Sequence, residues 1–316
     1  MTVAEATSHP SPLVLRAVTT TRHGWIDWLP LIVFPLAVLL LIPPHWPRWG
    51  LMWSLALAIY IGCKWLTWRC AHVVTAKRWQ HAAYLIAWPG LDADAFLRPP
   101  DRSNVVCPST AECVGALAMT TTGVILFFQI TPRLAHSHAL GAGWLGFAAI
   151  LLILHFGLFH LLSCAWRSIG VQAAPLMNNP LAAESVSEFW GRRWNTAFRD
   201  FTHKFLFGPL TSRLGPKGAL LIGFLFSGLV HDLVISLPAG AGYGGPTLFF
   251  IIQGTAMLIE RSPGGRRCGL GRGWRGWLFT MMVLVGPVCF LFHPPFATRV
   301  IVPFVRDVVS FDVTYD

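Results

Sequence analysis

The stretch LLIGFLFSGLVHDLVISLP, residues 220–238, decides the fold class of this chain. Its length matches the roughly 20 mostly apolar residues that an α-helix needs to cross a bilayer. Its only charged residue is Asp232, and its apolar residues follow one another without the alternation typical of a membrane barrel strand. The stretch therefore predicts a transmembrane helix, at about residues 218–238.

Six further stretches have the same character, at about 26–43, 49–69, 112–131, 143–164, 246–260 and 276–293. The sequence predicts an all-α polytopic membrane bundle with about 7–8 transmembrane helices, because an eighth could lie near 295–310. The whole chain, 1–316, is expected to form a single membrane domain. Two shorter or more amphipathic stretches, 82–98 and 194–212, predict interfacial or re-entrant helices.

The composition supports this class of protein and excludes two others. Hydrophobic residues make up 54% of the chain and charged residues only 12%, about half the usual share of a soluble domain. So hydrophobic a chain is not intrinsically disordered. It also carries too little charge outside its apolar stretches for a nucleic-acid-binding groove, so no nucleic acid partner is expected.

The basic residues indicate the orientation of the chain in the membrane. When alternate loops are assigned to opposite sides, 19 of the 24 Lys and Arg residues fall on the side of the N-terminus. Because cytoplasmic loops are rich in these residues, residues 1–24 are predicted to be a cytoplasmic segment of a multi-pass membrane protein. Seven spans place the C-terminus outside, and an eighth would reverse that.

The first candidate site is the segment NPLAAESVSEFWGRRWN, residues 179–195. Ser185 and Glu188 form the pattern of a helix-capping box. A continuous helix from there would place Asn195 between the guanidinium groups of Arg192 and Arg199. Such a site could hold the phosphates of a soluble substrate, with Asn195 polarising the reacting group. The alternative is a juxtamembrane helix that contacts lipid headgroups.

The second candidate is His231, inside the quoted stretch. Ionisable groups at membrane depth usually face a cavity or a pathway, and a neutral imidazole can act as a general base. Asp232 is not expected to orient it, because adjacent helix residues point about 100° apart. The alternative is a structural histidine bonded to a neighbouring helix. His155 and His160 are expected to be polar links between helices.

Other polar residues carry weaker expectations. Asp27 and Lys64 lie in neighbouring spans and could pair with each other. The loop 261–275 is rich in Arg and Gly and could hold a phosphate, although a merely basic, flexible cytoplasmic loop is the commoner case. The seven Cys residues lack the close pairs of a zinc site, so no metal is expected and reduced structural thiols are favoured.

Two motifs carry a resemblance to a known family. The box SVSEFWGRRWN, residues 185–195, is similar to the S-L-x-x-F-W-G-R-R-W-N box of wax synthases. The segment FLFSGLVHD, residues 224–232, is similar to their F-x-x-S-G-x-x-H-E segment. Residues 88–304 thus resemble the wax synthase-like branch of the membrane-bound O-acyltransferase superfamily, with weaker matches at 88–92 and 291–296. Asp232 departs from the Glu that is common in the family.

The resemblance implies an acyltransferase that moves a fatty acyl group from acyl-CoA to the hydroxyl of a lipophilic alcohol. It implies His231 as the general base and Asn195 as its catalytic partner. No metal or bound cofactor is implied, because acyl-CoA is a co-substrate. The residues expected to bind substrate are Trp190, Arg192, Arg193, Trp194 and Arg199. The alternatives are a transporter or proton path that uses His231 and Asp232, and a non-catalytic lipid-binding protein.

Overall fold

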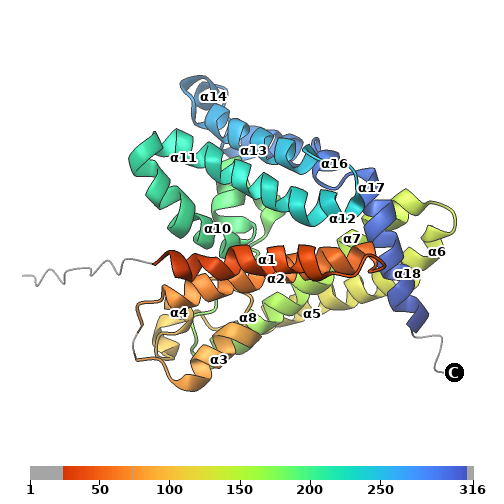
Figure 1. Cartoon of the computed structure of the whole chain (residues 1–316). Coiled ribbons are helices and arrows are strands. Elements are labelled where there is room, and N and C mark those ends of the chain that lie inside the picture. Colours follow the sequence, from red (N-terminus) through yellow and green to blue (C-terminus); the bar gives the residue numbers. More distant parts are fainter. Residues whose placement is uncertain (1–23, 74, 312–316) are drawn as a thin grey trace, which may run out of the picture.

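The computed structural model describes residues 24–73 and 75–311. The predicted cytoplasmic segment 1–24 lies outside them except for its last residue. Helices joined by short turns make up the described part of the chain, and no strand occurs there. The expected all-α fold is confirmed (Figure 1).

Five helical stretches are long and apolar enough to cross a membrane, by length and composition. They coincide with five of the seven predicted spans. Short π-helical segments interrupt three of them without ending the helix, and the label η is used for these and for the short 3-10 helices. The stretches are α2 (Arg48–Arg69), α5–η3–α6 (Thr110–Ile125, Leu126–Ile130, Thr131–Ala135), α7–η4–α8 (Ala139–Leu151, Leu152–Leu158, Phe159–Ser168), α10–η7–α11–η8–α12 (Thr196–Thr202, His203–Phe207, Gly208–His231, Asp232–Ser236, Leu237–Ala239) and α15–α16 (Gly273–Val285, Val288–Leu291).

The other two predicted spans are helices of 17 residues, which is short for a crossing. The first comprises η1 (Trp25–Trp28) and α1 (Leu29–Leu41), and packs along α2 (Figure 1). The second, α13 (Gly245–Arg261), packs along α11. Residues 294–311 form α17 (Pro294–Phe296), η9 (Ala297–Ile301) and α18 (Val302–Phe311), which are not among the five candidate spans.

The two amphipathic stretches are mostly helical, with breaks. Residues 82–98 form the end of α3 (Arg78–Ala87), a turn and the short α4 (Ala93–Phe96). The helix that begins at Thr196 breaks at Gly215, whose φ of 70° and ψ of 170° are not helical. This break separates the segment predicted as interfacial from the span that carries His231.

The remaining short elements lie near the first candidate site and in the loops. They are η2 (Arg102–Asn104), η5 (Pro180–Ala182), α9 (Val186–Glu188), η6 (Phe189–Arg193) and α14 (Pro263–Arg267). The two largest buried clusters surround Phe96 and Phe201 on one side, and Phe249, Phe250 and Phe296 on the other.

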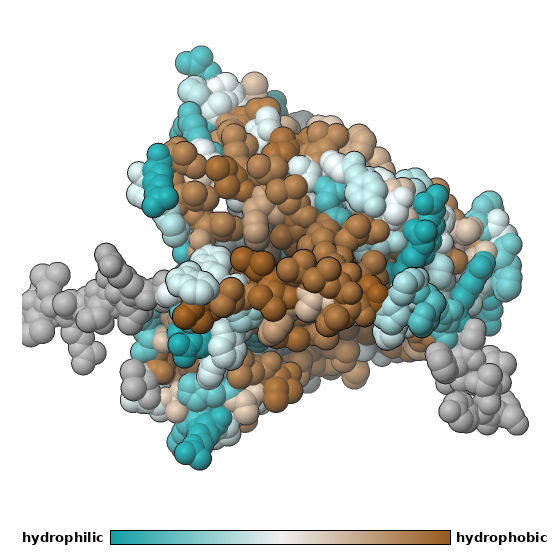
Figure 2. All heavy atoms as spheres, in the orientation of Figure 1, coloured by the Kyte–Doolittle hydropathy of each residue, from teal (hydrophilic) through white to brown (hydrophobic). Residues whose placement is uncertain are grey.

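Hydrophobic side chains also cover the outside of the molecule. Figure 2 shows them across the middle of the visible face, over α1 and its neighbours, with hydrophilic side chains toward the ends. Leu36, Leu40 and Leu57 are among those exposed. A wide exposed apolar surface of this kind fits a protein surrounded by lipid, and the structure is that of a multi-pass membrane protein.

Candidate active site

Side-chain caps and an ion pair hold the segment that precedes Asn195. The Ser185 hydroxyl accepts a hydrogen bond from the Glu188 N–H at 2.8 Å, as the predicted capping box requires. The Glu188 carboxylate does not complete the capping box. It accepts a hydrogen bond from the Glu184 N–H and forms an ion pair with Arg193 at 2.7 Å. Burial opposes ionisation of Glu188, but these two partners outweigh it and hold its pKa below the usual range.

The helix that follows is not continuous, so the predicted helical face around Asn195 is wrong. Trp194 is extended, and Asn195 adopts the left-handed conformation with φ 42° and ψ 61°. The Asn195 Oδ1 atom accepts a hydrogen bond from the Phe198 N–H at 3.2 Å and so caps α10. Asn tolerates this conformation and caps helices well, which explains why the chain breaks at this residue.

The arginines at positions 192, 193 and 199 have different surroundings, and Asn195 does not lie between two of them on one helical face. Arg193 pairs with Glu188 and donates to the carbonyl oxygens of residues 178 and 179. Arg199 donates to the Gly191 carbonyl at 2.7 Å and pairs with Asp200. Arg192 is exposed and makes no hydrogen bond or ion pair with the described residues. Of the three, it alone keeps its guanidinium open to a ligand.

The two tryptophans of the box pack into the bundle in different directions. Trp190 packs against Phe224 of α11 and Phe250 of α13, and its Nε1 donates to Gln253 at 3.4 Å. Trp194 stacks on Phe189, with ring centres 5.5 Å apart. It also meets Phe156 of η4 edge to face, with ring centres 6.4 Å apart. The box is therefore anchored to three of the helical stretches that surround it.

His231 ends α11, and its two nitrogens face different surroundings. Its Nδ1 atom lies 2.7 Å from the Ser227 carbonyl oxygen, so this nitrogen carries the proton and donates it. The Nε2 atom has no hydrogen bond in the described part of the chain and keeps a free lone pair. Such a neutral tautomer is the form that a general base requires.

Phe250 joins the two motifs. Its ring centre lies 4.5 Å from that of His231 and 5.5 Å from that of Trp190. The side chain is 4% exposed. Its position between the motifs could not be predicted, because one Phe in an apolar stretch of sequence gives no signal of its own. The structure thus brings the box and the histidine helix together at two places, by the direct contact of Trp190 with Phe224 and through the ring of Phe250.

Asp232 serves helix α13 and does not contact the His231 ring. Its carboxylate accepts hydrogen bonds from the Gly244 and Thr247 N–H groups, at 2.8 and 3.1 Å, and from the hydroxyl of Ser236 at 2.9 Å. These groups lie at the start of α13 or, for Ser236, in η8. Asp232 therefore caps a neighbouring helix and, as expected, makes no direct contact that would orient the imidazole of His231.

The other membrane histidines and Lys64 show mixed outcomes. His160 bonds to Glu112 of α5 at 2.8 Å, so the predicted link between helices is confirmed. The prediction is wrong for His155, whose buried Nδ1 has no hydrogen-bond partner in the described part of the chain. The expected Asp27–Lys64 pair is also wrong. Lys64 donates to the Gly90 carbonyl, and Asp27 pairs with Arg69.

One cluster has ligand atoms close enough together to hold a metal ion. Single atoms of Glu112, His160 and Cys164 lie within 4.8 Å of one another. The Arg167 guanidinium already pairs with Glu112 and lies 3.7 Å from the Cys164 sulfur. Because a fixed cation occupies the cluster, we interpret it as a joint between α5 and α8. The seven Cys residues are all free thiols.

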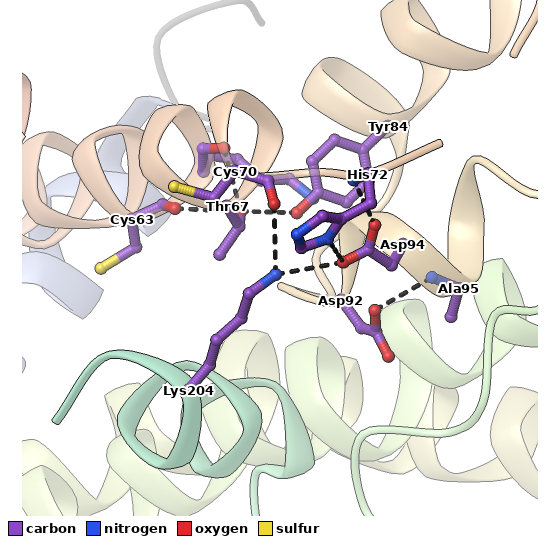
Figure 3. Close-up of polar contacts among 10 residues, drawn as sticks. Cys63, Thr67, Cys70, His72, Tyr84, Asp92, Asp94, Ala95 and Lys204 are labelled. Atoms are coloured by element: carbon purple, nitrogen blue, oxygen red, sulfur yellow. Dashed lines mark hydrogen bonds and ion pairs between the residues drawn. The ribbon is translucent and has the colours of Figure 1, made fainter. Parts of the chain in front are cut away.

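A cavity of about 390 Å³ with a mixed polar and apolar lining lies between the end of α2, α4 and η7. Figure 3 shows polar contacts among the residues around it. Lys204 reaches across it to Asp94 at 3.1 Å, and the Asp94 carboxylate also accepts the His72 N–H at 2.6 Å. Asp92 caps α4 through the Ala95 N–H. The stretch 88–92, a weak match to the family, therefore forms part of a structural junction beside the helix that follows the box.

The fold and these contacts define a class of protein: a multi-pass helical membrane protein whose two motifs pack against each other. The sequence model of the membrane bound O-acyl transferase family matches residues 173–252, which contain both motifs. The resemblance to the wax synthase-like branch of this superfamily is thus confirmed.

Curated relatives agree with that family. A long-chain-alcohol O-fatty-acyltransferase of Simmondsia chinensis is 30% identical over 105 residues, which is 30% of each chain. A probable long-chain-alcohol O-fatty-acyltransferase 9 of Arabidopsis thaliana is 29% identical over 142 residues, 41% of this chain and 42% of its own. An acyl-CoA–sterol O-acyltransferase 1 of Arabidopsis thaliana is 32% identical over 98 residues, 28% of each chain. The aligned segments thus span less than half the length of these relatives.

Proposed function

We propose that this protein is a membrane-bound O-acyltransferase that moves a fatty acyl group from acyl-CoA to the hydroxyl of a lipophilic alcohol. The observation that carries the proposal is the junction at Phe250, whose ring lies between that of His231 and that of Trp190 in the box. The family match covers both motifs, and the relatives' names specify long-chain alcohols and a sterol as acceptors.

His231 acts as the general base in this proposal. The Ser227 carbonyl holds the Nδ1–H, so Nε2 accepts the proton of the alcohol as its oxygen attacks the thioester carbon. A C–O bond forms, the C–S bond breaks, and the imidazolium returns the proton to the sulfur of the departing CoA. The base is thereby regenerated, and no covalent acyl-enzyme is required.

Asn195 stabilises the oxyanion that forms during the attack. Its Oδ1 is used by the cap of α10, while its Nδ2 group makes no hydrogen bond with the described residues. That amide has two N–H donors available for a substrate oxygen. A donor already fixed by the fold stabilises a developing negative charge most effectively in a site that excludes water.

The phosphates of the acyl donor first meet Arg192 and the arginine-rich loop 261–275. The loop is tied to the box by two bonds, from Gly273 N–H to the Glu184 carboxylate at 2.7 Å and from Arg261 to the Ser187 hydroxyl at 2.9 Å. Arg266, Arg267, Arg272 and Arg275 are exposed. The excess of basic residues on this side supports a cytoplasmic N-terminus and entry of the donor from the cytoplasm.

Of the other residues expected to bind substrate, Arg193, Arg199, Trp190 and Trp194 contact protein groups in the structure. We propose that the two arginines hold the shape of the box and that the two tryptophans line its inner side. The transporter or proton path receives less support. The described residues show no hydrogen bond joining His231 to His155 or His160, so no observation favours such a path.

The test is ester formation by purified protein in lipid nanodiscs, with labelled acyl-CoA and a panel of alcohols, and products identified by mass spectrometry. We expect the His231→Ala variant to lose activity while it folds normally. His136→Ala is the matched control, because His136 is exposed and distant from both motifs in sequence. Undiminished activity in the His231→Ala protein would sink the assignment of the base. If neither the wild type nor the His136→Ala control forms ester, that result would favour a lipid-binding role.

A further inference from the structure

A buried hydrogen-bonded chain runs from η8 to the start of α17. Ser236 donates its hydroxyl proton to the Asp232 carboxylate at 2.9 Å, and its Oγ lies 3.3 Å from the Nε2 atom of His293. The Nδ1 atom of His293 lies 3.2 Å from the Phe296 N–H. Ser236 is fully buried and His293 is 6% exposed. These residues include the histidine of the stretch 291–296.

The partners fix the direction of every proton in this chain. Because a backbone N–H can only donate, the Nδ1 of His293 is an acceptor and its Nε2 carries the proton. Ser236 can give its own proton to the Asp232 carboxylate or, at 3.3 Å, to the Gly242 carbonyl oxygen, and with either acceptor its oxygen accepts from His293. The chain therefore runs from Phe296 through His293 and Ser236 to Asp232. Burial lowers the pKa of His293 despite the nearby charge of Asp232, which agrees with a neutral ring.

Close packing locks His293 against the turn before α13. Gly242 has φ 75°, and a Cβ atom there would lie 2.2 Å from the His293 ring. The Asp232 carboxylate at the other end of the chain caps α13 through Gly244 and Thr247. The polar chain therefore fixes both the turn and the first residues of α13.

The position of α13 determines the surroundings of His231. A Cβ atom on Gly228 would lie 2.5 Å from the Thr247 Cα, so α11 and α13 touch closely just before His231. One turn after Thr247, Phe250 places its ring 4.5 Å from that of His231. A shift at the start of α13 would therefore move the ring against which the imidazole rests.

We infer that His293 is a positioning residue for His231, acting through Ser236, Asp232 and helix α13. This inference rests on the proposed acyl transfer. His293 does not touch the His231 ring, and it holds the base in place through the cap of α13. Because small misplacements of catalytic groups are costly, loss of the chain should lower kcat by about 10- to 100-fold.

The experiment separates the two hydrogen bonds of His293. In His293→Asn, the side-chain oxygen can replace Nδ1 at Phe296, but the amide is too short to reach Ser236. In His293→Gln, the longer amide can replace the Nε2 donor. Ser236→Ala removes the middle of the chain, and Thr298→Ala, which removes a hydroxyl bonded only to the Pro294 carbonyl, is the matched control. Each variant is assayed in nanodiscs for kcat, KM for acyl-CoA and thermal unfolding.

We expect the His293→Asn and Ser236→Ala variants to lose kcat with KM unchanged, and His293→Gln to restore most of it. Wild-type kcat in His293→Asn, or an equal loss in the His293→Asn and His293→Gln variants, would overturn the inference. So would a fall in kcat that merely follows the amount of folded protein. Absence of ester formation by the wild type would instead refute the proposed function, so the two failures are distinguishable.

Discussion

Replacing Asn195 by Gly separates the two roles of this side chain. Asn195 has φ 42°, a left-handed conformation that Gly adopts readily, so the backbone break before α10 should survive. The lost cap to Phe198 should cost only a few tenths of a kcal/mol, since Gly is itself tolerated at this position of a helix. Thermal unfolding should therefore change little.

The activity should change far more. Loss of one oxyanion donor lowers kcat by about 100- to 1000-fold, equivalent to about 3–4 kcal/mol of transition-state stabilisation. The free-energy effect on catalysis should thus exceed the effect on stability about tenfold. The Asn195→Asp variant is the companion, because its carboxylate can keep the cap but offers no N–H donor.

The assay is single-turnover ester formation in nanodiscs, with unfolding followed on the same samples. Retention of more than about a third of wild-type kcat by Asn195→Gly would refute the oxyanion role, since a donor worth less than 1 kcal/mol is not the one described. Parallel losses of kcat and stability would reduce Asn195 to a helix cap.

Three further predictions follow from the contacts. Arg192→Gln should raise the KM for acyl-CoA about tenfold with kcat unchanged. Arg193→Gln, which breaks an ion pair, should instead lower the unfolding temperature. Equal KM values for the wild type and Arg192→Gln would contradict the role of Arg192. Burial opposes the ionisation of Asp94, but its hydrogen bonds, including that from Lys204, outweigh burial and lower its pKa. The ionised carboxylate therefore stabilises the fold above the unfolded-state pKa near 4, and this stabilisation is lost as the pH falls through the lower folded-state pKa. An unfolding temperature with the same acid dependence in Asp94→Asn and wild type would argue against this. Phe250→Leu should lower kcat more than KM in the ester assay, and wild-type kcat would show that its ring does not position His231.

Much of the fold follows from apolar length alone. The five stretches with long apolar runs are helices because every backbone group must be bonded within the segment in a lipid environment. Helix α13 and the N-terminal helix were also predicted, at 246–260 and 26–43, within two residues of the ends that the structure shows. Turns and packing decide those ends.

The geometry around the residues that the sequence singled out could not be predicted. Helical periodicity predicted one continuous helix through Asn195. In the structure the helix breaks there, and the Asn195 side chain caps the next helix through the Phe198 N–H. Local spacing also gave no sign that Arg193 is paired and Arg192 is not. The carboxylate of Asp232 illustrates the limit, because its partners lie at residues 244 and 247, on another helix.

The exposed apolar surface of the bundle has a consequence for how the proposed acyl transfer must be measured. In three of the five spanning stretches only 17% of the most apolar window is buried inside the protein. Most of that surface meets lipid, so an alcohol dissolved in the bilayer reaches the protein without crossing water. The proposed acyl transfer should then respond to the mole fraction of alcohol among the lipids rather than to its molarity. Inert phospholipid acts as a diluent of the substrate, although it never touches the chemistry.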